Sequence, residues 1–431
     1  MTGPSGLSYE IMSERTVVIK ILTPPQRIIL HKSALFGRLW LCLSLLLLLL
    51  TFTPSLAYTE DVPQDDTVLY NIMAADRDKF GNILDNAEKY EVQILFTEII
   101  RDENNHPTFI QHEYNLDANR YFAPASAVKM VIAALTLQKL NRLDIEGVDR
   151  DCTLTFTQAN WWDTAESGCT VATYVRRVLQ NSDNNCYNRL YEFLGTEYIN
   201  ETLRGMGYTH VQLNRRYNMQ TSARQDSITG PVKVIKNGKV LYSEPTRQSS
   251  IQYTLENSGM EGLLRGDRYY SSRGIVQGPK SFYEWNFLSV ETLQGVLKAI
   301  AFPDSVEPRY RFDLSESDRL YLMEWLLGTS SSSRKYLYYG AKSGEVDPHI
   351  KIYNKTGTAY GNLLDNAYIV DTKNNIEFML TAVIYVNENG TIGDDTYAYK
   401  TIGMPFLKNI GQAVHGYLLE KKTAQDNYPQ Q

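Results

Sequence analysis

Apolar residues alternate with polar ones near both ends of the chain, whereas its middle has apolar residues at helical spacing. Alternation over four to eight residues is typical of half-buried strands. The predicted strands are Tyr90–Ile100, Thr108–Tyr114, Ile350–Tyr353, Ala367–Val370 and Ile376–Tyr385. The last three follow one another closely and predict an antiparallel meander. Strands need partners, so the two terminal groups are expected to join into one sheet.

Helical spacing fills most of the chain between and around these strands. The predicted helices are Val68–Tyr90, a helix from Ser126 to Leu140, Val171–Leu179, Cys186–Leu194, Tyr198–Met206, Ser289–Ala301, Glu316–Leu327 and Met404–Leu419. This order predicts a multi-domain α+β protein in which the terminal helices flank an antiparallel sheet and the middle helices form a separate all-helical lobe. A cleft between the two lobes is the expected place for a site.

The N-terminal segment differs from the rest of the chain. Five basic side chains precede an apolar run, Leu39–Phe52, and small residues end the segment at Ala57. This pattern predicts a secretory signal peptide at residues 1–57, removed after Ala57, and a periplasmic or secreted protein. The alternative is an uncleaved N-terminal anchor, which would then be the protein's contact with a membrane.

The remaining chain divides by composition into a linker, one large domain and a tail. Residues 58–66 are predicted to be a linker, 67–422 the domain and 423–431 a disordered tail. Residues 228–286 resemble an insertion and contain a hairpin signal at Asn237-Gly238. The insertion is either a lid over a site or a surface excursion.

Charge and cysteine content narrow the possible partners. Residues 1–57 carry five basic and two acidic side chains, so their removal lowers the formal net charge from −6 to −9. An acidic chain of this kind argues against nucleic acid as a partner. Cys152, Cys169 and Cys186 remain, and they form either a Cys152–Cys169 bridge with a buried Cys186 or three free thiols. The histidines are scattered and no C-x-x-C pair occurs, so neither a metal nor another cofactor is expected.

Ser126 and Lys129 lie three residues apart in the stretch YFAPASAVKM. In a helix, this spacing places both side chains on one face within a turn of each other. A serine hydroxyl becomes an effective nucleophile when a neighbouring base removes its proton. A buried lysine that is held neutral can act as that base.

Two further polar motifs follow in order. Short polar side chains at Asn181-Ser182-Asp183-Asn184 predict a turn that ends a helix and directs Ser182 and Asn184 outward. Lys355-Thr356-Gly357 follows a predicted strand. The order and spacing of S-x-x-K, S-D-N and K-T-G resemble the penicillin-recognising serine hydrolases, most closely the class A β-lactamases. The resemblance covers residues 90–420 and implies a β-lactamase/transpeptidase-like fold.

The resemblance also implies catalytic roles for three residues. Ser126 would attack the substrate carbonyl and become acylated, and Lys129 would accept or relay its proton. Ser182 would pass a proton to the leaving nitrogen. The substrate would be a β-lactam or a peptidoglycan stem peptide.

Five other positions correspond to substrate-binding groups of that family. Asn184 would orient the substrate and Lys129, and Lys355 and Thr356 would bind the substrate carboxylate beside Gly357. The backbone N–H groups of Ser126 and Thr358 would form an oxyanion hole.

One element of the class A pattern is missing. Those enzymes carry a glutamate on an Ω-loop that activates the deacylating water. Here Leu213-Asn214-Arg215 resembles part of that loop, and Arg215 is predicted to pair with Asp226, the one carboxylate between Thr202 and Ser243. An amide at Asn218 or Gln220 could hold a water but could not accept its proton.

Three functions therefore remain open at this stage. The first is a secreted serine hydrolase that opens β-lactams, slowly without the glutamate. The second is a D-alanyl-D-alanine carboxypeptidase, whose relatives lack the same glutamate. The third is a non-catalytic cell-wall-binding protein, against which the intact polar motifs argue.

Overall fold

The computed structural model describes residues 62–63, 67–157, 168–328, 334–340 and 347–427. All of them lie in the compact unit Leu56–Gln431, one of two units into which the chain divides. The predicted leader, 1–57, lies outside the described residues, and part of the predicted linker, Val62–Pro63, is strand β1. In the described part of the chain, no helix has the length and apolar character needed to cross a membrane.

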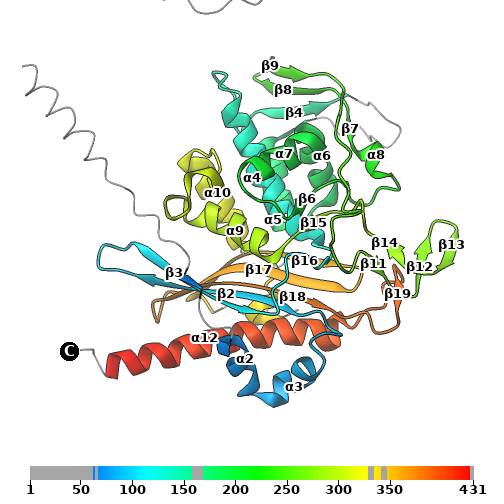
Figure 1. The fold of residues 1–431 in the computed structure, drawn as a ribbon. Helices are drawn as coiled ribbons and strands as arrows, with labels where there is room; N and C mark the ends of the chain where they lie inside the picture. The colour runs from blue at the N-terminus through cyan, green and yellow to red at the C-terminus, as the bar shows by residue number, and fades with distance from the viewer. Residues whose placement is uncertain (1–61, 64–66, 158–167, 329–333, 341–346, 428–431) are drawn as a thin grey trace, which may run out of the picture. The chain divides into compact units, whose positions relative to one another are not determined.

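The central sheet joins strands from both ends of the domain, as the sequence predicts (Figure 1). Within the described residues its six strands have the order β1-β3-β2-β18-β17-β16. Their bounds are β2 Gln93–Arg101, β3 Pro107–Tyr114, β16 Ile350–Ala359, β17 Asn362–Asp371 and β18 Ile376–Tyr385. All neighbours pair antiparallel except β1 and β3, which pair in parallel. The α+β class predicted from the sequence is confirmed.

The terminal helices cover one face of this sheet (Figure 1). They are α2 Thr67–Ala74, α3 Arg77–Asp85 and α12 Met404–Asn427. Alternate residues of β18, including Phe378 and Leu380, join Phe406 of α12 in one buried apolar cluster, because successive side chains of a strand point to opposite faces.

Two sequence predictions at the chain ends need correction. The predicted helix Val68–Tyr90 is two helices, because Asp76 interrupts it and its side chain accepts a hydrogen bond from the Lys79 N–H as the N-cap of α3. Residues 423–427 continue helix α12, so the predicted disorder from Thr423 is wrong for them. Residues 428–431 lie outside the described part.

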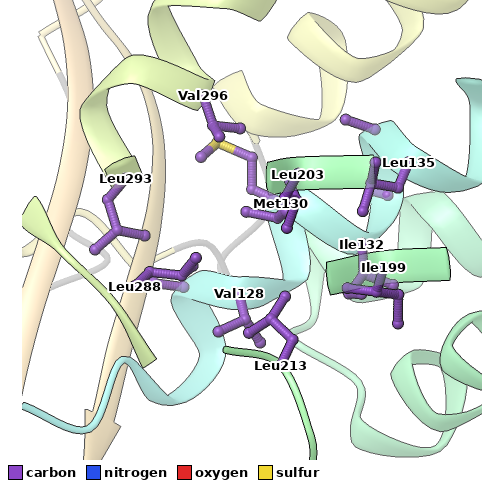
Figure 2. Packing of buried hydrophobic residues seen from close by; sticks show 14 of the residues in the cluster. Val128, Met130, Ile132, Leu135, Ile199, Leu203, Leu213, Leu288, Leu293 and Val296 are labelled. Carbon is purple, nitrogen blue, oxygen red and sulfur yellow. The ribbon is translucent and has the colours of Figure 1, made fainter. Parts of the chain in front are cut away.

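The helices of the middle segment form the second lobe, whose central helix α4 is Val128–Arg142. Around it lie α5 Val171–Gln180, α6 Asn184–Leu194, α7 Thr196–Gly205, α9 Val290–Ala301 and α10 Glu316–Leu327. Figure 2 shows Val128, Met130 and Ile132 of α4 among side chains of α7 and α9. Helix α4 is buried on all sides as far as Leu140, which is typical of a helix at the centre of a lobe.

The predicted insertion is built into both lobes. Strands β8 Val232–Lys236 and β9 Lys239–Glu244 form the expected hairpin at Asn237-Gly238, and β8 also pairs with β4 Thr153–Phe156 of the helical lobe. Strand β5 Cys169–Thr170 completes that sheet. Further on, the hairpin of β12 Arg268–Ser271 and β13 Gly274–Gln277 pairs with β19 Thr391–Ile392, which follows the central sheet.

The other elements are short. They are 3₁₀ helices η1 Ala125–Ala127, η2 Pro303–Ser305 and η3 Pro308–Tyr310, π-helix η4 Tyr399–Gly403, helices α8 Ala223–Asp226 and α11 Tyr336–Tyr339, and strands β6 Val211–Gln212, β7 Ile228–Thr229, β10 Arg247–Gln248, β11 Leu264–Arg265, β14 Lys280–Ser281 and β15 Phe287–Leu288. Cys152, Cys169 and Cys186 are free thiols, which agrees with the second of the two cysteine arrangements left open by the sequence.

The two lobes meet where β16 passes the turn before α4. A Cβ atom added to Gly357 would lie 2.3 Å from the carbonyl oxygen of Pro124. The next nearest atom, in the Leu364 side chain, would lie 3.1 Å away. The shorter separation is far below van der Waals contact, so only a residue without a side chain allows the strand to approach the turn this closely. Gly357 therefore sets the distance between the K-T-G strand and the segment that carries Ser126.

We predict that Gly357→Ala lowers the free energy of unfolding by about 1–3 kcal/mol, because the added methyl group must push two backbone segments apart. Urea denaturation measures this change. Gly416→Ala is the matched control, since no atom lies within 4 Å of its added Cβ in helix α12. The control should gain up to about 1 kcal/mol from helix propensity. Equal stability of Gly357→Ala and the wild type would contradict the prediction.

Candidate active site

Ser126 lies at the point where the chain turns into helix α4. It is the middle residue of η1, and Ala125 before it has a φ of 47°, in the left-handed region that is costly for a residue with a side chain. From Tyr121 to Leu140, every residue is buried except Ser126, which is half-buried. The local fold therefore presents one hydroxyl out of an otherwise enclosed segment.

Lys129 is buried beside Ser126, one turn further along the chain. Its Nζ lies 3.0 Å from Ser126 Oγ and 3.2 Å from Ser182 Oγ. It also donates to the carbonyl oxygen of Ser182 and to Asn184 Oδ1. Residues from two distant segments thus converge on one amine, as the sequence motifs predict.

The surroundings of Lys129 favour the neutral amine. Burial, followed by the charge of Lys355, lowers the pKa of Lys129 to about 6. Asp183 acts in the opposite direction, but its carboxylate is bound to Arg177 at 2.7 Å. At neutral pH, Lys129 can therefore accept the proton of Ser126, which an ammonium group could not do.

The turn between α5 and α6 directs Ser182 and Asn184 toward Lys129. Ser182 has a φ of 56°, and the Asp183 carboxylate caps α6 by accepting from the Cys186 N–H at 2.9 Å. Asp183 therefore holds the turn, whereas its two neighbours reach the site. This is the turn predicted from the run of short polar residues.

Lys355 approaches the same hydroxyl from the central sheet. Its Nζ lies 3.1 Å from Ser182 Oγ, so Ser182 stands between two amines. Burial lowers the pKa of Lys355 to about 7, although the buried Asp365 carboxylate opposes this effect. At neutral pH, Lys355 is therefore partly charged, whereas Lys129 is mostly neutral.

Gly357 and Thr358 continue strand β16 past the Ser126 segment. The close approach at Gly357 places this part of the strand beside the turn that carries the Ser126 N–H. The Thr358 hydroxyl lies 3.4 Å from that of Tyr336, and Thr356 is buried. The roles of Thr356, Thr358 and the oxyanion hole stay predictions.

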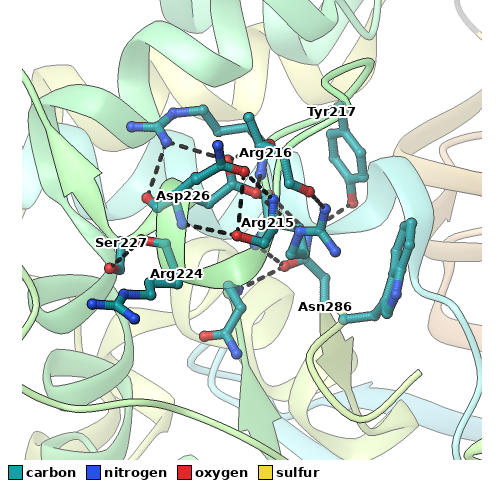
Figure 3. A network of polar contacts seen from close by, with 12 residues as sticks. Arg215, Arg216, Tyr217, Arg224, Asp226, Ser227 and Asn286 are labelled. Carbon is teal, nitrogen blue, oxygen red and sulfur yellow. Dashed lines mark hydrogen bonds and ion pairs between the residues drawn. The ribbon is translucent and has the colours of Figure 1, made fainter. Parts of the chain in front are cut away.

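The segment that resembles an Ω-loop is fixed by buried ion pairs (Figure 3). Arg215 and Asp226 pair at 2.9 Å, as predicted from the sequence. Arg216 also pairs with Asp226, at 3.3 Å, and with Glu192. Removing one partner of a buried pair leaves an uncompensated charge, so such pairs hold a segment in one conformation.

Tyr217 is the residue of this segment that touches the site, and sequence reasoning missed it. Its hydroxyl donates to the carbonyl oxygen of Ala125, and the Lys129 Nζ lies 5.5 Å from the centre of its ring. The Asn286 amide, at 3.3 Å, contacts the same hydroxyl (Figure 3). The available signal is its position two residues after Arg215, which pairs with Asp226 and so fixes this segment.

The glutamates of the insertion do not replace the missing carboxylate. Glu244 pairs with Lys139 at 2.8 Å. Lys139 lies ten residues beyond Lys129 on α4, which is about 15 Å along the helix axis. Glu261 pairs with Arg120 at the surface, Glu256 is exposed, and Glu284 accepts a hydrogen bond from the Gln252 amide. Among the described residues, no carboxylate is hydrogen-bonded to Ser126 or Lys129, and no group of histidine, cysteine and acidic side chains could hold a metal ion.

Part of the chain matches a known protein family. The beta-lactamase enzyme family matches residues 77–257, a segment that contains Ser126, Lys129 and Ser182. This match confirms the resemblance to the serine β-lactamases and supports a β-lactamase-like hydrolase. No curated protein matches the chain.

Solved β-lactamase structures are similar to the chain over most of its length. One from Desulfarculus baarsii is 15% identical, covers 81% of this chain and 98% of its own, and has a TM-score of 0.47. A class A β-lactamase from Mycobacterium abscessus is 16% identical, with 81% and 99% coverage and a TM-score of 0.45. The extended-spectrum β-lactamase TLA-3 is 13% identical, with 82% and 100% coverage and a TM-score of 0.47.

We predict a bell-shaped pH profile for acylation of Ser126 by a penicillin. Below about pH 6, Lys129 becomes protonated and loses its ability to accept the serine proton, so the rate falls with decreasing pH. Above about pH 7, Lys355 loses the charge that attracts the substrate carboxylate, so the rate falls again. Stopped-flow or quenched mass measurements of the second-order acylation rate test this. An acid limb near the ordinary lysine pKa would contradict it.

Proposed function

We propose that this chain is a secreted serine hydrolase that forms an acyl-enzyme on Ser126 with β-lactams and releases the product slowly. The observation that carries the proposal is the 3.0 Å contact between Lys129 Nζ and Ser126 Oγ in a site that favours the neutral amine. The family match supports the same reaction class.

The contacts support the following path for acylation. Ser126 Oγ attacks the lactam carbonyl carbon while its proton moves to the Lys129 amine, 3.0 Å away. The C–N bond then breaks, and the proton passes by way of Ser182 Oγ to the leaving nitrogen. Lys355 holds the substrate carboxylate and lies 3.1 Å from the Ser182 hydroxyl. The product is an ester of Ser126 with the opened lactam.

The same surroundings favour a long-lived ester. Hydrolysis of the ester needs a base that activates a water. In the described part of the site no carboxylate is hydrogen-bonded to Ser126 or Lys129, and the neighbouring Asp183 is paired with Arg177. In the Ω-like segment, the side chain that faces Lys129 is the ring of Tyr217. Burial raises the pKa of the Tyr217 phenol, so the phenol remains protonated at neutral pH and cannot act as the base. Slow release follows from the absence of a base and from the apolar ring beside the amine.

A second candidate is a D-alanyl-D-alanine carboxypeptidase acting on peptidoglycan stem peptides. The contact between Lys129 and Ser126 favours this reaction as well, because it uses the same acylation groups. The reaction also does not require the Ω-loop glutamate, which is missing here. Release of D-alanine from a peptide ending in D-alanyl-D-alanine would distinguish it. A cell-envelope location is expected for either activity, because the substrates occur there.

We predict that benzylpenicillin adds its full mass to the protein and that Ser126→Ala abolishes this adduct. Intact-mass spectrometry measures both results, and Lys129→Ala should also prevent acylation while the protein remains folded by circular dichroism. Ser272→Ala, an exposed serine of the insertion, is the matched control and should be acylated like the wild type. An adduct that persists in Ser126→Ala would place the nucleophile elsewhere.

We also predict that the adduct, once formed, lasts for many minutes after free penicillin is removed. The reason is the missing base described above, and time-resolved mass spectrometry gives the lifetime. Steady hydrolysis of a chromogenic cephalosporin at about ten per second, near the median for enzymes, would contradict slow release. Such turnover would show that another group activates the water.

A further inference from the structure

The insertion places a lysine among aromatic rings beside the candidate site. The Lys280 Nζ lies 5.0 Å from the ring centres of Tyr269 and Trp285 and 5.9 Å from those of Phe282 and Tyr360. Three of these rings belong to the insertion, and the fourth belongs to the turn between β16 and β17. We refer to Lys280 and these four rings as the aromatic cage.

Lys280 has no oxygen partner within the described structure. An ammonium group has three N–H donors, and ring faces attract its charge without accepting these hydrogen bonds in the usual geometry. Burial, followed by the charge of Arg215, lowers the pKa of Lys280, and no carboxylate contributes in the opposite direction. Lys280 is half-buried, so part of its side chain remains accessible to solvent.

Unlike Lys280, the neighbouring arginines each have a carboxylate partner. Arg215 stacks on Trp285 at 4.6 Å but is neutralised by Asp226. Arg265 lies 4.3 Å from the ring centre of Tyr385 and pairs with Glu91. The cage therefore contains one cation whose charge is balanced by no described acid.

The cage begins where the proposed substrate strand ends. Tyr360 follows Gly357 by three residues, which is about 10 Å along a β-strand. On the other side, Trp285 precedes Asn286, whose amide contacts the Tyr217 hydroxyl, and that hydroxyl in turn contacts the Ala125 carbonyl next to Ser126. An extended acyl group of a few residues, bound along β16 from Ser126, would reach the cage.

We propose that the aromatic cage is a second substrate subsite, in which Lys280 binds a carboxylate on the acyl portion of the substrate. This inference rests on the proposed function and adds a substrate class to it: acyl groups that carry a negative charge, such as an acidic peptide. The rings contact the carbon atoms near that carboxylate and exclude water, which strengthens the ion pair. The carboxylate bound by Lys355 is a different one, on the leaving side of the scissile bond.

Benzylpenicillin and carbenicillin provide a matched pair of probes, because carbenicillin carries one additional carboxylate on its acyl side chain. In Lys280→Gln, we expect the acylation efficiency with carbenicillin to fall about tenfold, while that with benzylpenicillin stays within about twofold of the wild type. Arg273→Gln removes the same charge from an exposed position of the β12–β13 hairpin and should change neither value. Lys280→Arg should restore most of the carbenicillin efficiency.

A salt titration of the wild-type protein provides an independent measurement that does not depend on the folding of a variant. The efficiency with carbenicillin relative to benzylpenicillin should fall as ionic strength rises, because the additional contact is an ion pair. A ratio that is insensitive to salt and to Lys280→Gln would overturn the subsite and leave the proposed function standing. Failure of both penicillins to acylate Ser126 would instead refute the proposed function.

Discussion

The site depends on the contact between the buried amine of Lys129 and the hydroxyl of Ser126. The amine contacts this hydroxyl at 3.0 Å and also holds the turn that carries Ser182 and Asn184. An ammonium group would be costly to bury without a carboxylate partner, so the fold favours the neutral form that can accept a proton. The packing of helix α4 on all sides, which produces this burial, is therefore also the source of the chemistry.

Lys355 adds a second amine through a long-range constraint. It comes from the central sheet, whereas Lys129 comes from the helical lobe, and the Ser182 hydroxyl lies between them. The two lobes can meet at this distance because residue 357 has no side chain against the Pro124 carbonyl. The charge of Lys355 adds to the effect of burial in lowering the pKa of Lys129, so the sheet contributes to the electrostatics of the helical lobe's amine.

The sequence predicted the central sheet and the polar motifs because each depends on local patterns. Alternation identified β18, and the run of short polar residues identified the turn at Ser182. It did not predict Tyr217, because its role depends on where Asn286 and Ala125 lie in space, which no local pattern encodes. The end of α12 was also missed, since a polar C-terminal sequence resembles a solvated helix and a disordered tail equally.

The ion pairs that fix the Ω-like segment have a consequence for the evolution of this protein. Asp226 is bound by both Arg215 and Arg216, so a change in the position of Tyr217 would have to disturb several buried charges at once. A single substitution is therefore more easily accommodated at position 217 itself than by rearranging the backbone around it. The buried charges therefore set the backbone of this segment, and the side chain at position 217 is the part that can change without disturbing them.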